Sequence, residues 1–152
     1  MKYRLWQSLL ALLISLSPAQ AQMFEICDGG PAGAALEEGA AQFGRSFANG
    51  KVTIFNVYVD QNLRNGVLLA VLHPQPGDLA GAGYFQGCTA VYRDDGGPAY
   101  FGQVFIDRAE ASYDPATGLT ITVPVRNILA GKWVEDAVVM VVNQETGWIG
   151  VK

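Results

Sequence analysis

The chain has 152 residues, of which 50% are hydrophobic and 16% are charged, and its formal net charge is −4. This composition fits one ordinary globular domain. The acidic balance argues against nucleic acid or an anionic membrane as the partner, because both are bound by basic surfaces.

The N-terminal residues have the pattern of an export signal. Lys2 and Arg4 carry positive charge, an uncharged apolar run follows, and Ala19 and Ala21 are small residues at the positions that a signal peptidase reads. The apolar run is too short for the ~20 residues that a membrane-spanning helix needs. We expect a signal peptide of residues 1–21 and a single β domain of residues 22–152, with no membrane span after cleavage.

Cys27 and Cys88 are the only two cysteines. In an exported chain an isolated pair is typical of a structural disulfide, which here would attach the N-terminal segment to the sheet. No Asn-x-Ser/Thr glycosylation sequon is present, and this favours a bacterial source. We therefore expect a periplasmic or secreted bacterial protein.

Beyond the signal, a turn-forming cluster leads into residues 34–43, whose Ala, Leu and Glu content predicts a short helix that Gly39 weakens. From residue 51 onwards, short runs of Val, Ile, Phe, Tyr and Thr are separated by Gly, Pro, Asn and Asp, as in strands. The expected strands are residues 51–59, 67–73, 87–93, 100–107, 110–113, 119–125, 137–143 and 148–151.

Two hydrophobic patterns indicate how these strands are buried. Residues 120–123 alternate Thr, Ile, Thr and Val, which is typical of a strand with one wet face. Residues 67–72 and 138–142 are apolar at every position, so both faces of these strands are expected to meet another layer or a partner.

Turn residues predict antiparallel connections. Residues 113–119 contain the Asp-Pro-Ala-Thr-Gly sequence of a bulged hairpin, Asn65-Gly66 has the composition of a two-residue turn, and residues 95–98 form a third turn. We expect an all-β antiparallel sandwich of about eight strands with a short N-terminal arm or helix. A closed β-barrel is the alternative.

Few side chains form a known catalytic or metal-binding pattern. His73 is the only histidine, and a place at the sheet rim is favoured over a role as base or ligand. Asp94 and Asp95 lie in a turn that could hold Ca²⁺, but a solvated turn is favoured. The pairs Glu37-Glu38 and Glu135-Asp136 have the same interpretation. We expect no metal and no cofactor.

Aromatic residues are the candidates for a binding surface. Tyr84 and Phe85 end a Pro- and Gly-rich stretch from residue 74 to 86, and Trp133 and Trp148 lie between polar or glycine neighbours. Loops with aromatic side chains on a β scaffold are frequent binding surfaces, although core positions are the alternative for all four rings.

The hypothesis for function is therefore a non-enzymatic binding or protein-interaction module whose partner is an envelope protein, a glycan or a small ligand. One alternative is an envelope hydrolase acting on glycan, with Asp94, Asp95 or Glu135 as acid and base. Another is a structural envelope subunit that adds a strand to the edge of a neighbouring sheet.

Overall fold

The computed structural model describes residues 22–28, 30–60, 62, 65–75, 86–95 and 98–151. The strands of the first sheet are β1 (Gln22–Ile26), β2 (Arg45–Phe47), β3 (Val52–Tyr58), β4 (Val67–Pro74), β5 (Gln86–Asp94) and β6 (Pro98–Ala99). The strands of the second sheet are β7 (Gln103–Val104), β8 (Glu110–Asp114), β9 (Gly118–Leu129), β10 (Lys132–Val142) and β11 (Ile149–Val151). The helical segments are α1 (Pro31–Glu37) and the 3-10 turns η1 (Ala40–Phe43) and η3 (Ile106–Arg108).

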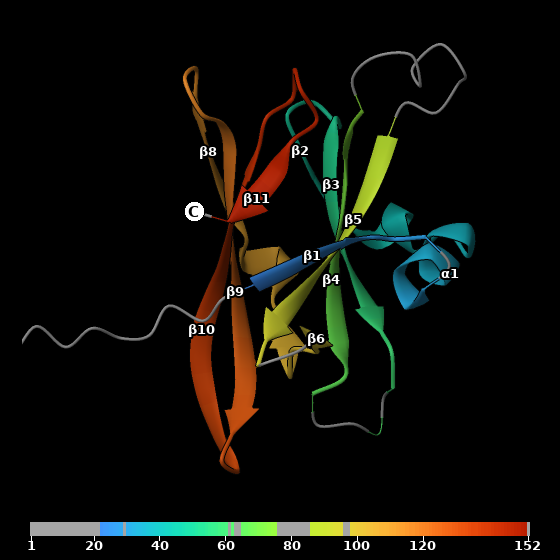
Figure 1. Cartoon of the computed structure of the whole chain (residues 1–152), viewed down its shortest axis with the longest axis vertical. Coiled ribbons are helices and arrows are strands. Elements are labelled where there is room, and N and C mark those ends of the chain that lie inside the picture. The colour runs from blue at the N-terminus through green and yellow to red at the C-terminus, as the bar shows by residue number, and fades with distance from the viewer. Residues whose placement is uncertain are drawn as a thin grey trace, which may run out of the picture.

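Two antiparallel sheets make up the body of the protein (Figure 1). The first has the strand order β1-β5-β4-β3-β2, with β6 paired to β5, and the second has the order β11-β10-β9-β7, with β8 paired to β9. The predicted antiparallel sandwich is confirmed. The closed barrel is wrong, because the strands form two separate sheets.

The main core lies between the sheets. Alternate residues of each strand face inwards, so that Ile54 and Leu69 of the first sheet and Ile121 and Met140 of the second belong to one buried cluster. Thr120 and Thr122 lie on the opposite face of β9 and are partly exposed. The alternation predicted for residues 120–123 is therefore confirmed.

The other face of the first sheet is covered by the N-terminal segment. Phe55, Leu68 and Ala90 form a second buried cluster on that face, together with Ala32 of α1. Strand β4 consequently has one face on each cluster, and its residues 67–73 are all buried. This is the two-sided burial that the apolar run at residues 67–72 predicted.

The disulfide joins the N-terminal strand to the sheet. Cys27 and Cys88 are bonded, with their Cα atoms 5.3 Å apart, as predicted. Strand β1 pairs with β5 along its whole length, and the Cys27 N–H donates to the Cys88 carbonyl oxygen at 3.1 Å. A Cβ on Gly33 would overlap the carbonyl oxygen of Cys27, so the glycine lets α1 pack directly against the bridge.

The helical segment differs from its prediction. A continuous helix was expected over residues 34–43, whereas α1 starts three residues earlier, at Pro31, and ends at Glu37. Proline is favoured in the first turn, where its missing N–H is not needed. Gly39 has a φ of +82°, and the chain resumes after it as the short turn η1. The positive φ therefore divides the expected helix into two pieces.

The boundaries of β3, β4, β5, β8 and β11 were predicted to within one residue at each end, and those of the other strands were predicted poorly. The strand expected at residues 100–107 is wrong, because only Gln103 and Val104 pair with β9 and a 3-10 turn follows. Strands β1 and β2 were not predicted. Strands β9 and β10 are longer than the expected 119–125 and 137–143, because their pairing continues into residues 126–129 and 132–136, where polar and apolar types are mixed.

Of the three predicted turns, the one at residues 113–119 is confirmed and the one at Asn65-Gly66 is wrong. In the β8–β9 hairpin, Thr117 N donates to Asp114 O at 3.2 Å and Gly118 has a φ of +103°. Gly96 and Gly97 of the third predicted turn lie outside the described residues; the flanking strands β5 and β6 pair antiparallel. The two-residue turn at Asn65-Gly66 is wrong, because β3 ends at Tyr58 and β4 begins at Val67, so more than two residues join these strands.

Within the described ranges, the longest apolar helix is too short to span a membrane, so no candidate span is found. Residues 1–21, where the export signal is predicted, lie outside those ranges.

Candidate pocket at the sandwich edge

A pocket of about 590 Å³ opens where the end of β3 meets the segment that contains β7. Its walls come from both sheets, since β3 and β4 belong to the first and β7 to the second. The lining residues are Tyr58, Asp60, Gly66, Val67, Gly102, Gln103, Val104 and Phe105. We call this the edge pocket.

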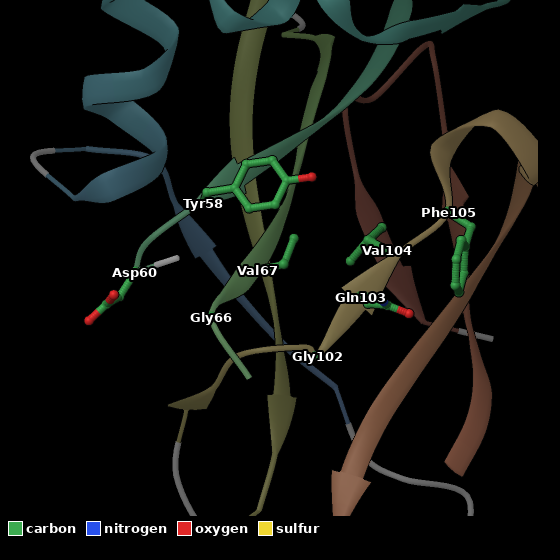
Figure 2. Close-up of a pocket in the computed structure, with 8 residues that line it drawn as sticks. All are labelled: Tyr58, Asp60, Gly66, Val67, Gly102, Gln103, Val104 and Phe105. Atoms are coloured by element: carbon green, nitrogen blue, oxygen red, sulfur yellow. The ribbon is translucent and has the colours of Figure 1, made fainter. Parts of the chain in front are cut away.

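Figure 2 shows how the lining side chains are arranged. Tyr58 and Val67 stand on the side of the first sheet, and Val104 and Gln103 stand on the side of β7. The hydroxyl of Tyr58 is directed towards the β7 side in this view, whereas the Asp60 carboxylate points away from the other lining side chains. The pocket thus combines two aromatic rings, those of Tyr58 and Phe105, with two valines and the polar groups of Asp60 and Gln103.

Tyr58 reaches the pocket because the core ends there. On β3, Val52 and Ile54 are fully buried between the sheets, and Asn56 and Tyr58 follow on the same face. Asn56 Nδ2 donates to the Val104 carbonyl oxygen at 3.1 Å and thereby joins the two sheets. Beyond this link the sheets leave space, and Tyr58 is 63% exposed.

A second asparagine, Asn65, holds the β3–β4 connection in place beside the pocket. The Asn65 side chain accepts from Ile128 N at 3.1 Å and donates to Ile128 O at 3.3 Å. It therefore binds the β9 backbone as a neighbouring strand would. The β3–β4 connection is attached to the second sheet by this pair of bonds, which explains why Asn65 does not form the predicted turn.

An aromatic and cationic cluster borders the pocket. The Arg126 guanidinium lies 5.8 Å from the ring centre of Phe105 and 5.7 Å from that of Trp133. Arg126 Nε also donates to Glu135 Oε1 at 2.7 Å, and Arg108 lies 4.5 Å from the Phe105 ring centre. Contacts of this kind favour planar stacking of the guanidinium on the rings.

Gly102 lets this cluster reach the pocket wall. A Cβ there would lie 2.7 Å from Cζ3 of Trp133 and 2.9 Å from Oδ1 of Asn65, so a larger residue would collide with both. The Trp133 ring packs against the Gly102 backbone and is still 50% exposed. Trp133 is therefore a direct neighbour of Gly102, which lines the edge pocket.

The four aromatic residues predicted as a binding surface have different outcomes. Trp133 contacts the lining residue Gly102, whereas Tyr84 and Phe85 lie outside the described residues. Trp148 packs its ring against Gly150, which pairs with Val141 of β10. Val141 is eight residues from Trp133 along β10, roughly 26 Å in an extended strand. The two tryptophans consequently do not share one patch.

His73 is a buried structural residue. It is 6% exposed, and its Nε2 is within hydrogen-bonding distance of Thr89 Oγ1 at 2.9 Å. Burial lowers the pKa of His73, while a hydrogen bond to the Pro74 carbonyl acts in the opposite direction. It belongs to β4, where it pairs with Gly87 of β5, and it does not line the edge pocket.

The predicted acidic residues do not assemble into one site. Asp95 forms an ion pair with Arg93 on the first sheet, and Glu135 forms one with Arg126 on the second. Asp136 Oδ1 accepts from the backbone N–H of Ala137 at 2.8 Å. Among the described residues, no three His, Cys, Asp or Glu side chains are grouped closely enough to hold a metal ion.

Sequence reasoning missed Tyr58, Gln103 and Phe105. A signal for Tyr58 was available: period-two alternation along β3 places polar Asn56 on the core face of an otherwise apolar strand, and this marks the end of the core. Gln103 and Phe105 offered no comparable signal, because β7 is too short to show alternation.

Comparison of the chain with protein-family models, with curated proteins and with solved structures finds no match. Its function is therefore inferred from the pocket and its surroundings.

Proposed function

We propose that this protein is an exported, non-enzymatic binding module and that it holds its ligand in the edge pocket, beside Trp133. One observation carries the proposal: the pocket of about 590 Å³ contains a tyrosine that stays 63% exposed. Small-molecule sites in proteins have volumes of ~300–1,000 Å³ and combine apolar walls with a few polar groups.

The lining indicates the chemistry of the ligand. Tyr58, Val67 and Val104 offer apolar contact area, and Gln103 offers both a donor and an acceptor. Exposed aromatic rings stack well on flat apolar faces that carry hydroxyl groups at their rims. A short glycan has this character, and we propose it as the ligand class.

The proposed location is the bacterial periplasm or the cell exterior. A disulfide persists in an oxidising compartment, and Cys27 and Cys88 form one. The positively charged N-terminus and the short apolar run before residue 21 are the features of a cleaved export signal. Both observations support the same compartment.

Binding is favoured over glycan hydrolysis by the number of carboxylates at the pocket. Hydrolysis of a glycosidic bond uses two carboxyl groups, about 5 to 9.5 Å apart. Asp60 is the single carboxylate among the described lining residues, and the Glu135 carboxylate nearby is paired with Arg126. A paired-carboxylate mechanism would therefore need a group from elsewhere.

The test is a titration of the protein with glycan fragments, followed by the fluorescence emission of Trp133. In a Trp148→Phe variant, Trp133 is the only tryptophan of residues 22–152, so the emission reports on the surroundings of Gly102. We expect soluble glycan fragments of the cell envelope to shift this emission saturably. Tyr58→Ser should weaken binding at least about tenfold, the loss expected for one stacking contact.

Tyr113 supplies the matched control, because it is 65% exposed on β8 and does not line the edge pocket. Tyr113→Ser should bind as the parent does. Equal losses in both tyrosine variants, or no saturable shift with any fragment, would contradict the proposal. Release of shorter glycans during the titration would favour the hydrolase instead.

A further inference from the structure

The outer edge of β10 is only partly covered. Strand β9 pairs with all of Lys132–Val142, whereas β11 pairs only with residues 140–142 on the opposite edge. Within the described part of the chain, no strand pairs with residues 132–139 on that edge. In Figure 1 this half of β10 forms the outer border of the second sheet and runs down to the tip of the β9–β10 hairpin.

The direction of the backbone groups on this edge follows from the β11 ladder. Asn143 N donates to Trp148 O at 2.8 Å, so Asn143 directs its backbone groups towards β11. Backbone direction alternates along a strand. Trp133, Glu135 and Ala137 therefore direct their N–H and C=O groups towards the same open edge.

Of these three residues, Ala137 is already capped. Its N–H donates to Asp136 Oδ1 at 2.8 Å, and its carbonyl oxygen accepts from Gln22 Nε2 at 3.4 Å. Side chains that cap an edge in this way prevent another strand from pairing with it. Trp133 and Glu135 have no such cap among the described residues.

We propose that a second copy of this chain pairs with this edge, antiparallel, with Trp133 of one copy opposite Glu135 of the other. The two uncapped residues of each copy would then bond to those of its partner, and the two-fold axis would pass beside Val134. The result is a dimer in which the two second sheets form one continuous sheet.

Side-chain complementarity favours this register. It places Lys132 opposite Asp136 of the other copy and Val134, which is 40% exposed, opposite its own equivalent. Opposite charges and apolar pairs directly across a ladder are stabilising. A shift by one hydrogen-bonded pair towards β11 would set Glu135 against Glu135, and the opposite shift would set Glu135 against Gly131 in the hairpin turn.

Only a few residues of each copy meet in this arrangement. Interfaces below about 1,200 Å² are typical of weak and transient association. The dimer is therefore expected to form reversibly, with a dissociation constant in about the micromolar range or above.

Sedimentation velocity over a concentration series tests the proposal, on protein exported to and purified from a bacterial periplasm without added glycan. We expect a concentration-dependent monomer–dimer equilibrium. Glu135→Pro removes one outward N–H, and proline is tolerated on an edge strand where that N–H faces solvent. The variant should keep its fold, checked by circular dichroism, and dimerise at least about tenfold more weakly.

Glu135→Ala is the matched control. It removes the ion pair with Arg126 but keeps the backbone N–H, so it should dimerise far better than Glu135→Pro. If both variants lost dimerisation equally, the contact would depend on the carboxylate, and strand pairing would be wrong. A protein that stayed monomeric at every concentration would also overturn the proposal.

A cysteine at the two-fold axis gives an independent measurement. Directly opposed residues in a non-hydrogen-bonded antiparallel pair have Cα atoms about 4.5 Å apart, within the range that a disulfide spans. Val134→Cys should therefore give a covalent dimer under mild oxidation. Glu145→Cys, which is exposed in the β10–β11 turn, should not. Equal crosslinking of the two variants would indicate random collision and contradict the register.

Discussion

Strand β4 and the tip of the β9–β10 hairpin are both regular antiparallel structure, but their surroundings are opposite. Residues 67–73 of β4 are buried on both faces, whereas residues 130–135 at the hairpin tip are exposed on both. Packing layers on either side hold β4 in place. The tip is held by backbone pairing with β9, by the Arg126–Glu135 ion pair and by the contacts of Trp133 with Gly102 and Arg126. The tip is therefore available for contacts with other molecules at little cost to the fold.

Removal of the disulfide should have the largest effect on the layered half. Cys27 and Cys88 close a loop of 61 residues, and in the chain-entropy model such a bridge contributes about 4 kcal/mol. We expect the Cys27→Ala/Cys88→Ala double variant to lose about that much free energy of unfolding, measured in urea. A loss below about 1 kcal/mol would mean that α1 and β1 hold the sheet without the bridge.

A matched pair of alanine substitutions measures the contrast directly. Leu69→Ala removes a fully buried side chain between the two sheets and should cost about 3 kcal/mol. Val134→Ala, at the exposed tip, should change the free energy of unfolding by no more than about 0.5 kcal/mol. The free energies of unfolding of the two variants are compared by urea unfolding, at a protein concentration too low for a dimer to form. Similar costs would mean that the tip is packed in solution.

Asn127 marks the boundary between the two halves. Its side chain is fully buried on the core face of β9, and neither its Nδ2 nor its Oδ1 has a hydrogen-bond partner among the residues that the structure describes. Replacing a buried unsatisfied polar group with an apolar group of similar shape is neutral or stabilising. We expect Asn127→Leu to raise the free energy of unfolding by about 1 kcal/mol. Destabilisation would show that the amide is satisfied in solution.

The smallest expected effect is a pH dependence at the end of β4. Burial lowers the pKa of His73 in the folded protein, while in the unfolded chain histidine titrates near 6.5. Below about pH 6.5 the unfolded state therefore binds more protons, and stability falls with decreasing pH until the folded protein is protonated as well. Above about pH 6.5 the contribution of His73 to the free energy of unfolding is fully present.

His73→Gln should flatten this part of the stability profile, measured by urea unfolding at a series of pH values. The variant keeps a donor that can reach Thr89 Oγ1, so its loss at neutral pH should be modest. A profile with the same slope as the parent would assign the pH dependence to other groups.

The sequence predicted the parts of the fold that apolar patterns and turn residues specify. Two-sided burial of residues 67–72, the hairpin at residues 113–119 and the bond between Cys27 and Cys88 were all anticipated. Strands β1 and β2 were missed because their residues mix polar and apolar types, and they are strands only because β5 and β3 offer edges to pair with.

The candidate site was less predictable than the fold. Trp133 was identified as an exposed aromatic residue, but its proximity to Gly102 depends on how β7 meets β9, which no local pattern specifies. Tyr58 belongs to a different sheet, and only the sandwich brings it to β7. The pocket arises from contacts between distant segments, and single-sequence patterns do not record these.

The position of β1 has a consequence for the order of folding. It is the first described strand of the chain, yet its partner β5 follows about 60 residues later, after β2, β3 and β4. Pairing over such a sequence distance is slow, because the loop-closure entropy is lost before any contact is gained. The hairpin of β3 and β4 can form first, and β5 can then add to it. Until β1 arrives, β5 presents an open edge of its own, so a chain whose cysteines are kept reduced should aggregate more readily while it folds.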